Sequence, residues 1–271
     1  MPEGDTIWLA ARQLREALAG AVLVRCDLRV PKLATVDLSG RLVEDAVSRG
    51  KHLFIRFQGG WTLHSHLRMD GTWRIFAPGA RWTGGPAHQI RAILATADRV
   101  AVGYRLPVLE LLRAAEEAAA VKHLGPDLLG PDWDPDEALR RLISSPERAI
   151  GETLLDQRTM AGVGNVYKSE ICFLAGVTPW TPVKDVPEPA RLVASAHELL
   201  EENKARFGRI TTGDARPGRS LWVYDRARRP CLRCGTLVRS AMQVPGEAPT
   251  SDRARATYWC PRCQQGPAPI R

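Results

Sequence analysis

The sequence lacks the long hydrophobic runs that a membrane protein needs. No stretch of its 271 residues approaches the roughly 18 uncharged apolar residues of a membrane-spanning helix. It also lacks a signal-peptide pattern, because its first residues, Met1 to Asp5, are acidic where a signal peptide is basic and then apolar. We therefore expect no membrane span, no secretion by that route, and a cytoplasmic location.

Internal repeats and coiled-coil heptads are absent as well. Apolar residues make up 44% of the chain and charged residues 25%, which is ordinary for a folded protein and excludes a disordered chain or a fibre. The length allows one large domain or two ordinary ones, with enough chain to bury a sizeable core.

The net charge of +8 is concentrated in the last quarter of the chain. Residues 201–271 hold 14 Lys and Arg against 6 Asp and Glu, whereas the other 200 residues hold 24 of each. Clustered cationic side chains bind a polyanion well because they displace the counterions condensed on its phosphate groups. The segment therefore favours nucleic acid as a partner, and the alternative is a basic surface kept for solubility.

Four of the six cysteines form two Cys-x-x-Cys pairs with 25 residues between the pairs. Such a turn brings two thiolates about 3.5–4 Å apart, and two turns complete the tetrahedral shell that Zn²⁺ requires. Disulfides are the alternative, which the lack of a signal peptide disfavours. We predict one structural zinc ion held by Cys231, Cys234, Cys260 and Cys263. Cys26 and Cys172 lie in apolar contexts and are expected to be buried packing residues.

The hydrophobic periodicity predicts a strand-rich first half and a helical second half. A helix is expected at residues 6–19, with Asp5 as N-cap and Gly20 as its stop. Strands are expected at 21–28, 42–48, 52–57, 61–67, 72–76, 90–95 and 100–104, as in a sandwich or barrel. From about Leu109 the period becomes helical, and further helices are expected at 135–144, 150–155, 165–175 and 188–206. The turn-rich segment Gly125–Pro131 is the expected domain boundary.

Pro2 directly follows Met1, and an initiator Met before a small residue is commonly removed, which would expose a secondary amine. An α-amino group titrates near about pH 7.7–8.0, so roughly a tenth or more of it is a neutral nucleophile at pH 7. Attack on a sugar aldehyde carbon gives an iminium that acidifies the neighbouring C–H, and Glu3 is placed to shuttle protons. Most Met-Pro-Glu termini carry no chemistry, so an ordinary terminus is the alternative.

A group of motifs spread along the chain carries a family resemblance. They are the terminus Pro2-Glu3-Gly4 before a helix, the pair Gly50-Lys51, the segments 154–157 (LLDQ) and 161–170 (AGVGNVYKSE), and the four-cysteine finger. In this order they resemble the formamidopyrimidine-DNA glycosylase / endonuclease VIII family. The resemblance implies an α+β protein of two domains: an N-terminal catalytic β-sandwich flanked by helices (1–122), a linker (123–134) and a helical domain (135–271). The helical domain would carry a helix–two-turn–helix motif and a zinc β-hairpin finger at about 222–266.

The resemblance also implies base-excision repair, in which an oxidised base is removed and the strand is cut by β,δ-elimination. Pro2 would be the nucleophile that forms the imine, and Glu3 the general acid/base. Lys51 would contact phosphate and donate a proton in β-elimination. Arg255, five residues before Cys260, would bind the phosphates beside the lesion and serve δ-elimination. The expected partner is double-stranded DNA with oxidised bases or abasic sites, met by a monomer associated with the nucleoid.

Five further residues are expected to contact DNA. Gly162 and Gly164 allow a tight turn before a helix N-terminus that would point amides at a phosphate, with Asn165 as ligand, N-cap or both. The loop at 65–71 (SHLRMDG) resembles the family's void-filling loop, so Met69 would fill the gap left by a flipped base and Arg68 would reach DNA. His66 belongs to this loop, and a turn with Met69 in the core is the alternative. His123 stands where endonuclease VIII has a DNA-contacting Arg.

Three features favour the endonuclease VIII branch and oxidised pyrimidines as substrates. Gly4 follows Pro2-Glu3, residues 104–107 (YRLP) lack the Arg and Phe that the purine-directed branch inserts, and the segment 211–222 is short for a lid over 8-oxoguanine. Thr6 replaces a Glu common to both branches, and the finger spacing is long. The alternatives are a purine-directed glycosylase and a non-catalytic protein that binds damaged DNA.

Overall fold

The computed structural model describes residues 1–244 and 254–269, and the chain divides into two compact units, Met1–His123 and Leu124–Arg271. Each unit has its own hydrophobic core. Part of the expected finger, residues 245–253, lies outside the described residues. Among the helices of the described residues, none is long and apolar enough to cross a membrane.

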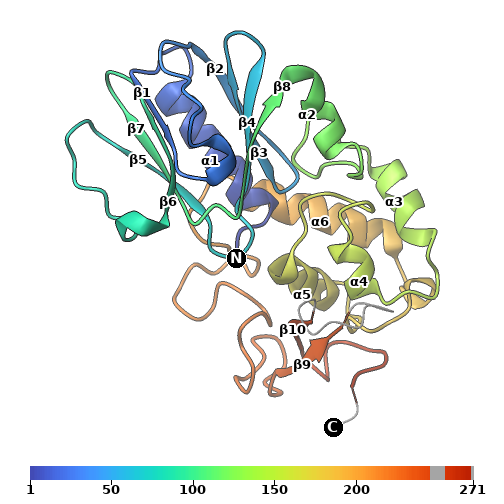
Figure 1. Ribbon diagram of the computed structural model, residues 1–271. Coiled ribbons are helices and arrows are strands. Elements are labelled where there is room, and N and C mark those ends of the chain that lie inside the picture. Colours follow the sequence, from blue (N-terminus) through green and yellow to red (C-terminus); the bar gives the residue numbers. More distant parts are fainter. Residues whose placement is uncertain (245–253, 270–271) are drawn as a thin grey trace. The chain divides into compact units, whose positions relative to one another are not determined.

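The first unit consists of two four-stranded antiparallel sheets with helix α1 (Gly4–Leu18) (Figure 1). One sheet has the strand order β1-β6-β7-β5 and the other has β2-β3-β4-β8. The strands are β1 (Arg25–Leu28), β2 (Val43–Arg49), β3 (His52–Phe57), β4 (Trp61–His66), β5 (Thr72–Phe76), β6 (Ile90–Ala95), β7 (Val100–Tyr104) and β8 (Val108–Arg113). The unit also holds helix α2 (Ala114–Val121) and the 3-10 turns η1 (Pro31–Leu33) and η2 (Ala87–Gln89). The predicted β-sandwich with helices is confirmed.

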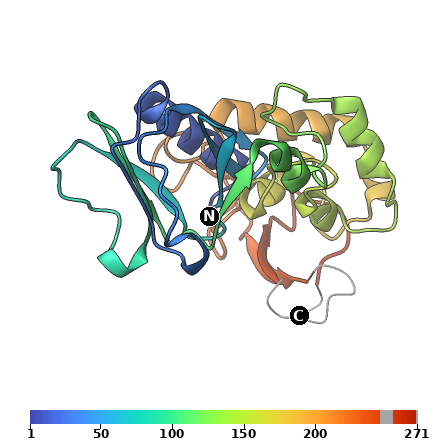
Figure 2. The same ribbon diagram turned by 45° about the horizontal axis from the view of Figure 1, so that its top comes forward.

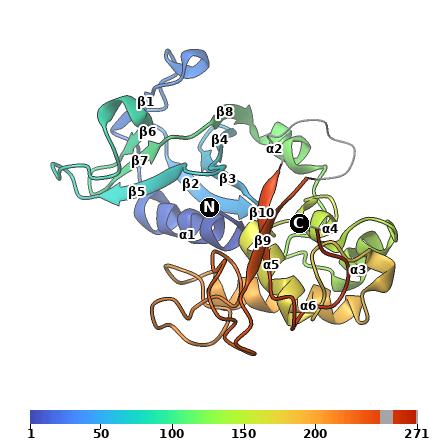
Figure 3. The same ribbon diagram turned by 90° about the horizontal axis from the view of Figure 1, so that it is seen from below.

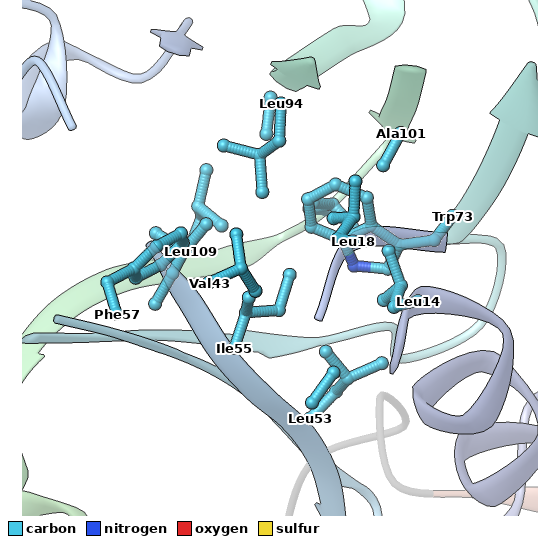
Figure 4. Close-up of a cluster of buried hydrophobic side chains, with 14 of the residues drawn as sticks. Leu14, Leu18, Val43, Leu53, Ile55, Phe57, Trp73, Leu94, Ala101 and Leu109 are labelled. Atoms are coloured by element: carbon cyan, nitrogen blue, oxygen red, sulfur yellow. The ribbon is translucent and has the colours of Figure 1, made fainter. Parts of the chain in front are cut away.

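The core of this unit joins one face of α1 to both sheets. Leu14 and Leu18, four residues apart and therefore on one side of the helix, are fully buried. Figure 4 shows them in one cluster with Ile55 of β3 and Trp73 of β5. The rigid attachment of α1 to both sheets fixes the start of the chain, because α1 begins only three residues after Met1.

The structure corrects three expectations for the first unit. Helix α1 starts at Gly4 and its N-cap is Glu3, not Asp5. Strand β1 starts at Arg25, later than expected. The helix expected from about Leu109 was wrong, because residues 108–113 form β8, which pairs with β4, and α2 starts only at Ala114. Short apolar runs fit either period, and here pairing along β4 decides for the strand.

In the described part of the second unit, four helices pack around one core. They are α3 (Pro135–Ile143), α4 (Ile150–Leu155), α5 (Asn165–Leu174) and α6 (Pro189–Asn203), with the 3-10 turn η3 (Val183–Asp185) before α6. The orange helix α6 is the longest and packs against α3 and α5 (Figure 2). Tyr167 and Ile171 of α5 and Leu200 of α6 are fully buried in this core. The predicted helical domain is confirmed, with small differences at the helix ends.

A two-stranded antiparallel hairpin completes the second unit. It pairs β9 (Arg239–Gln243) with β10 (Arg255–Trp259), and Figure 3 shows the hairpin, in red, beside α5. Strand β10 ends at Trp259, directly before Cys260. This hairpin therefore leads straight into the second cysteine pair, as expected for a finger.

Candidate active site

The predicted catalytic pair lies at the N-terminal end of α1. Pro2 is partly buried and Glu3 is fully buried, and the backbone carbonyl of Glu3 accepts the first helical hydrogen bond from the Ile7 amide at 3.1 Å. The next residues are also tied down, since the Thr6 amide and hydroxyl donate to the Asp5 carboxylate at 2.7 and 3.2 Å. The Glu3 side chain is thus held on a rigid element while Pro2 stays partly accessible.

Lys51 lies in the tight turn between β2 and β3, where Gly50 has a φ of 55°. The strand register places the end of β4 beside this turn, because His52 pairs with His66. Burial, together with the charges of Lys51 and Arg68, lowers the pKa of His66 to about 4. Lys51, His66 and Arg68 therefore share one small region at the ends of β3 and β4.

The loop after β4 presents Met69 to solvent. The Met69 side chain is 54% exposed, so the alternative of a core residue was wrong. Arg68 has a φ of 47°, a conformation that L residues rarely adopt, and its amide donates to Nδ1 of His66 at 3.0 Å. Arg105 braces the loop by donating through Nε to the Asp70 carbonyl at 3.0 Å. The loop is held from both sides with an unbranched apolar side chain at its tip.

His123 belongs to a histidine cluster that the sequence did not reveal. Its ring lies 6.0 Å from the ring of His52, which is hydrogen-bonded through Nδ1 to Nε2 of His64 at 2.9 Å. Nδ1 of His64 lies 3.1 Å from a carboxylate oxygen of Glu110 on β8. The alternation His64-Ser65-His66 was the one available signal, because residues two apart in a strand share a face.

In the second unit, the predicted helix–two-turn–helix segment is stabilised by side-chain hydrogen bonds. Gln157 donates through Nε2 to the carbonyls of Leu155 and Val163, both at 2.9 Å, and accepts from the Gly162 amide at 3.0 Å. Gly162 has a φ of 117°, a backbone conformation that would be strained for any residue with a Cβ atom. The Gln157 side chain therefore sets the turn that leads into α5.

Asn165 is the first residue of α5, and Gly164 is the N-cap, so the N-cap role considered for Asn165 was wrong. Its Nδ2 donates to the Ala256 carbonyl of β10 at 2.8 Å, and its buried Oδ1 has no partner within the described residues. Arg255 is the neighbouring residue at the start of β10 and is paired in register with Gln243. Asn165 and Arg255 are thus brought together through one strand.

Two buried charged residues of α5 fix its surroundings. Lys168 is fully buried and donates through Nζ to the Thr257 hydroxyl at 2.5 Å and to Oε1 of Gln243 at 3.3 Å, which joins α5 to both finger strands. Glu170, also fully buried, accepts from the amides of residues 222–224 at 2.7–2.9 Å and from the Thr211 hydroxyl. Burial raises the pKa of the Glu170 carboxyl, and these hydrogen bonds oppose that shift. Both residues lie in the recognised motif, but their roles depend on contacts that sequence order does not show.

The four cysteines of the two Cys-x-x-Cys turns come together. Their sulfur atoms all lie within 4.8 Å of one another, with Sγ distances of 3.9 Å for Cys231–Cys263 and 3.5 Å for Cys234–Cys260. Four thiolates at tetrahedral corners 2.3 Å from Zn²⁺ would lie about 3.8 Å apart, whereas a disulfide requires about 2.0 Å. The donor set fits a closed tetrahedral site. Cys172 is buried, which raises its thiol pKa to about 12, and Cys26 is half-buried.

Comparisons with known proteins give a consistent result over the whole chain. Two family models match, the formamidopyrimidine-DNA glycosylase N-terminal domain over residues 1–105 and the formamidopyrimidine-DNA glycosylase H2TH domain over residues 124–212. The "Probable endonuclease 8 2" of Streptomyces coelicolor is 65% identical over 99% of this chain and 96% of its own length. The DNA-(apurinic or apyrimidinic site) lyase Nei2 of Mycolicibacterium smegmatis is 51% identical over 97% of this chain and 99% of its own.

Solved structures share the fold. Lactococcus lactis formamidopyrimidine-DNA glycosylase, in complex with DNA containing an abasic site, is 23% identical and superposes with a TM-score of 0.80. The superposition covers 97% of this chain and 100% of that one. A structure of MutM with DNA containing carbocyclic 8-oxo-G gives the same TM-score over 98% of this chain.

Proposed function

This chain belongs to the formamidopyrimidine-DNA glycosylase and endonuclease VIII family, and we propose that it acts in base-excision repair as a DNA glycosylase and abasic-site lyase. The observation that carries the proposal is the presence of both family domains in one chain whose Pro2-Glu3 terminus leads directly into α1. Its partner is DNA with oxidised bases or abasic sites. We place it in the cytoplasm, at the nucleoid, as a monomer.

Pro2 is the nucleophile of this proposal. After removal of Met1, its secondary amine forms a bond to C1′ of the damaged nucleotide while the bond from C1′ to the base breaks, and the base leaves with a proton. The C1′–O4′ bond then breaks as the ring oxygen takes a proton from Glu3, and the resulting iminium acidifies the C2′–H bond. Loss of that proton expels the 3′-phosphate, and a second elimination expels the 5′-phosphate. Glu3 moves protons at the sugar ring, a role supported by its buried position beside Pro2.

Lys51 and Arg255 serve the two eliminations in this proposal. Lys51 contacts phosphate and supplies a proton in β-elimination, a role that its place beside His66 and Arg68 supports because this region carries two cations. Arg255 binds the phosphates that flank the lesion and acts in δ-elimination. Its neighbour Ala256 holds Asn165, so two proposed phosphate ligands act from one strand and one helix start.

Four residues of the first unit contact DNA in the same account. Met69 fills the space of the flipped base, which its 54% exposure at the tip of a braced loop supports. Arg68 reaches the DNA from the same loop. His66 and His123 lie at the adjacent histidine cluster and donate to phosphate.

One Zn²⁺ ion completes the finger in this proposal. Cys231, Cys234, Cys260 and Cys263 would hold it, and a closed shell of four thiolates gives a structural ion that orders the turns around the hairpin. The hairpin in turn carries Arg255 and the carbonyl that holds Asn165.

Oxidised pyrimidines are the proposed substrates. In the segment 104–107, Tyr104 and Leu106 are buried and Arg105 is engaged with Asp70 and Gln89, so this turn offers no aromatic side chain to insert opposite a purine lesion. The short segment 211–222 is drawn against Glu170, which supports the absence of a long lid over the base.

The test is a nicking assay on duplexes that each carry one lesion: thymine glycol, 5-hydroxycytosine, 8-oxoguanine or an abasic site. The protein is first weighed intact, since loss of Met1 lowers the mass by roughly 131 Da and frees Pro2. We expect nicking at the abasic site and at both pyrimidine lesions. Preferred cleavage at 8-oxoguanine would contradict the substrate assignment, and binding without any nicking would support a non-catalytic binder.

A further inference from the structure

Four of the six histidines gather on one face of the sheet β2-β3-β4-β8. His52 lies at the centre, and the ring centroids of His64, His66 and His123 are 5.1, 5.2 and 6.0 Å from its own. The other face of the same strands carries the apolar core, with Leu53 and Leu63 fully buried. The imidazoles therefore do not serve that core, and His66 and His123 lie on the side open to solvent.

The hydrogen bonds determine which ring nitrogens of the cluster carry protons. A carboxylate only accepts hydrogen bonds, so Nδ1–H of His64 donates to the carboxylate of Glu110 at 3.1 Å. Nε2 of His64 must then accept, and the donor is Nδ1–H of His52 at 2.9 Å. In the neutral ring this leaves Nε2 of His52 as a bare lone pair, which makes no hydrogen bond to any other described residue.

The tautomer of His66 follows in the same way. A backbone amide only donates, so Nδ1 of His66 accepts from Arg68 and the proton of the neutral ring lies on Nε2. His66 thus offers an N–H donor to an incoming anion, beside the cations Lys51 and Arg68. His52, by contrast, offers an acceptor for a proton. The cluster has a donor side and an acceptor side.

Burial and the neighbouring histidines explain why His52 is neutral in the free protein. Burial, together with His66, His64 and His123, lowers its pKa to about 3. Arg49 is opposite His52 in the β2–β3 register, Lys51 and Arg68 lie at the ends of the strands, and Lys122 precedes His123. Glu110 is the negative group at the far end of the chain of hydrogen bonds.

We propose that this histidine cluster is a DNA phosphate site that takes up one proton from solvent when it binds. Lys51, His66 and Arg68 face the phosphate, and Nε2 of His52 forms the new N–H bond. The negative phosphate favours the protonated form of His52 and so opposes the burial and the neighbouring histidines that lower its pKa in the free protein. The hydrogen bonds through His64 spread the added charge toward Glu110. The inference rests on the proposed function, because the phosphate is that of damaged DNA.

The experiment is calorimetric titration of the protein with a duplex that carries a tetrahydrofuran abasic-site analogue. It is done at pH 6 in buffers of different ionisation enthalpy, so that the slope of the binding enthalpy gives the protons taken up. We expect about 0.5–1 proton per complex, and by linkage an affinity that rises about threefold to tenfold for each unit of falling pH.

Two variants and one matched control locate the proton. His52→Gln removes the acceptor and should abolish the uptake. Glu110→Gln keeps an acceptor oxygen for His64 but removes the negative charge, so it should reduce the uptake and tests the idea even if His52→Gln misfolds. His88→Gln, an exposed histidine of the same unit outside the cluster, should leave the uptake unchanged.

The outcomes separate this inference from the proposed function. Wild-type protein that nicks abasic DNA but binds the analogue without proton uptake would overturn the phosphate site and leave the enzyme assignment intact. An uptake that persists at full size in both His52→Gln and Glu110→Gln would also overturn it. Wild-type protein that neither binds nor nicks abasic DNA would overturn both.

Discussion

The side chain of Asn165 connects the start of α5 to strand β10. Its Nδ2 holds the Ala256 carbonyl, while its Oδ1 is buried without a partner in the part of the chain that the structure describes. A buried polar atom without a hydrogen-bond partner is rare in folded proteins because it lowers stability, and such an atom often has a functional role. We therefore expect Asn165 to matter more for DNA than for the fold.

Replacing Asn165 by Ala removes the link to β10 and a phosphate donor. We expect the affinity for abasic-site DNA to fall about 10- to 150-fold, the equivalent of the roughly 1.5–3 kcal/mol that a hydrogen bond to a charged group contributes. Fluorescence anisotropy with labelled duplex measures it. Ser144→Ala, an exposed residue of the same unit, is the control, and an Asn165→Ala protein with wild-type affinity would contradict the assignment.

Met69→Ala tests the void-filling role. Because Met69 is exposed, its truncation should change the free energy of unfolding by less than about 0.5 kcal/mol. Base excision should nevertheless slow at least several-fold, while cleavage at a preformed abasic site is less affected because no base must be displaced. Ile143→Ala, 48% exposed at the end of α3, is the matched control. Equal loss of both activities would argue against a wedge.

At the scale of elements, the histidines of β3 and β4 make the free energy of unfolding depend on pH. The pKa of His52 is lowered to about 3 and that of His66 to about 4, mainly by burial, so the unfolded chain binds protons more readily than the folded one. The stability is therefore complete above about pH 6.5 and is lost as the pH falls toward 4. Urea unfolding between pH 7 and 4.5 should show this loss, and His52→Gln should flatten it. Constant stability over that range would contradict the buried, neutral cluster.

The finger is the second element that a single change tests. Cys260→Ser should release the metal, loosen the turn that follows β10 and weaken DNA binding through Arg255 and Asn165 together. Metal analysis and binding of the same preparation give the two readouts. Cys26→Ser, a half-buried thiol of the first unit, should change neither. Full DNA binding by metal-free Cys260→Ser protein would contradict the placement of Arg255.

The elements also show what sequence patterns were able to predict. Strands β3, β5, β6 and β7 were predicted at their observed bounds, because Gly, Pro or Asp residues of the flanking turns mark where these strands begin and end. Strand β8 was missed because Leu109, Leu111 and Leu112 fit a helix as well as a strand, and only pairing with β4 distinguishes them. The histidine cluster was hidden for a similar reason, since its histidines come from β3, β4 and the segment just after α2. Pairing of distant segments is the information that local patterns lack.

At the scale of the whole molecule, both units carry proposed phosphate ligands. Lys51 and Arg68 lie in the first unit, whereas Asn165, Arg255 and the positive excess of residues 201–271 lie in the second. Each neutralised phosphate releases condensed counterions, so the logarithm of the affinity should fall steeply with the logarithm of salt concentration. Arg255→Ala should lower that slope by about 0.9. A flat salt dependence would contradict the electrostatic part of the account.

The central claim is that Pro2 attacks the sugar carbon, and borohydride trapping tests it most directly. Mature protein is incubated with an abasic-site oligonucleotide in the presence of borohydride, beside a Pro2→Gly variant whose N-terminal processing is checked by mass. Reduction of the iminium makes the bond permanent. The account predicts a covalent complex for the wild type that is lost or strongly reduced in Pro2→Gly. No complex from correctly processed wild-type protein, or an undiminished one from the variant, would contradict it.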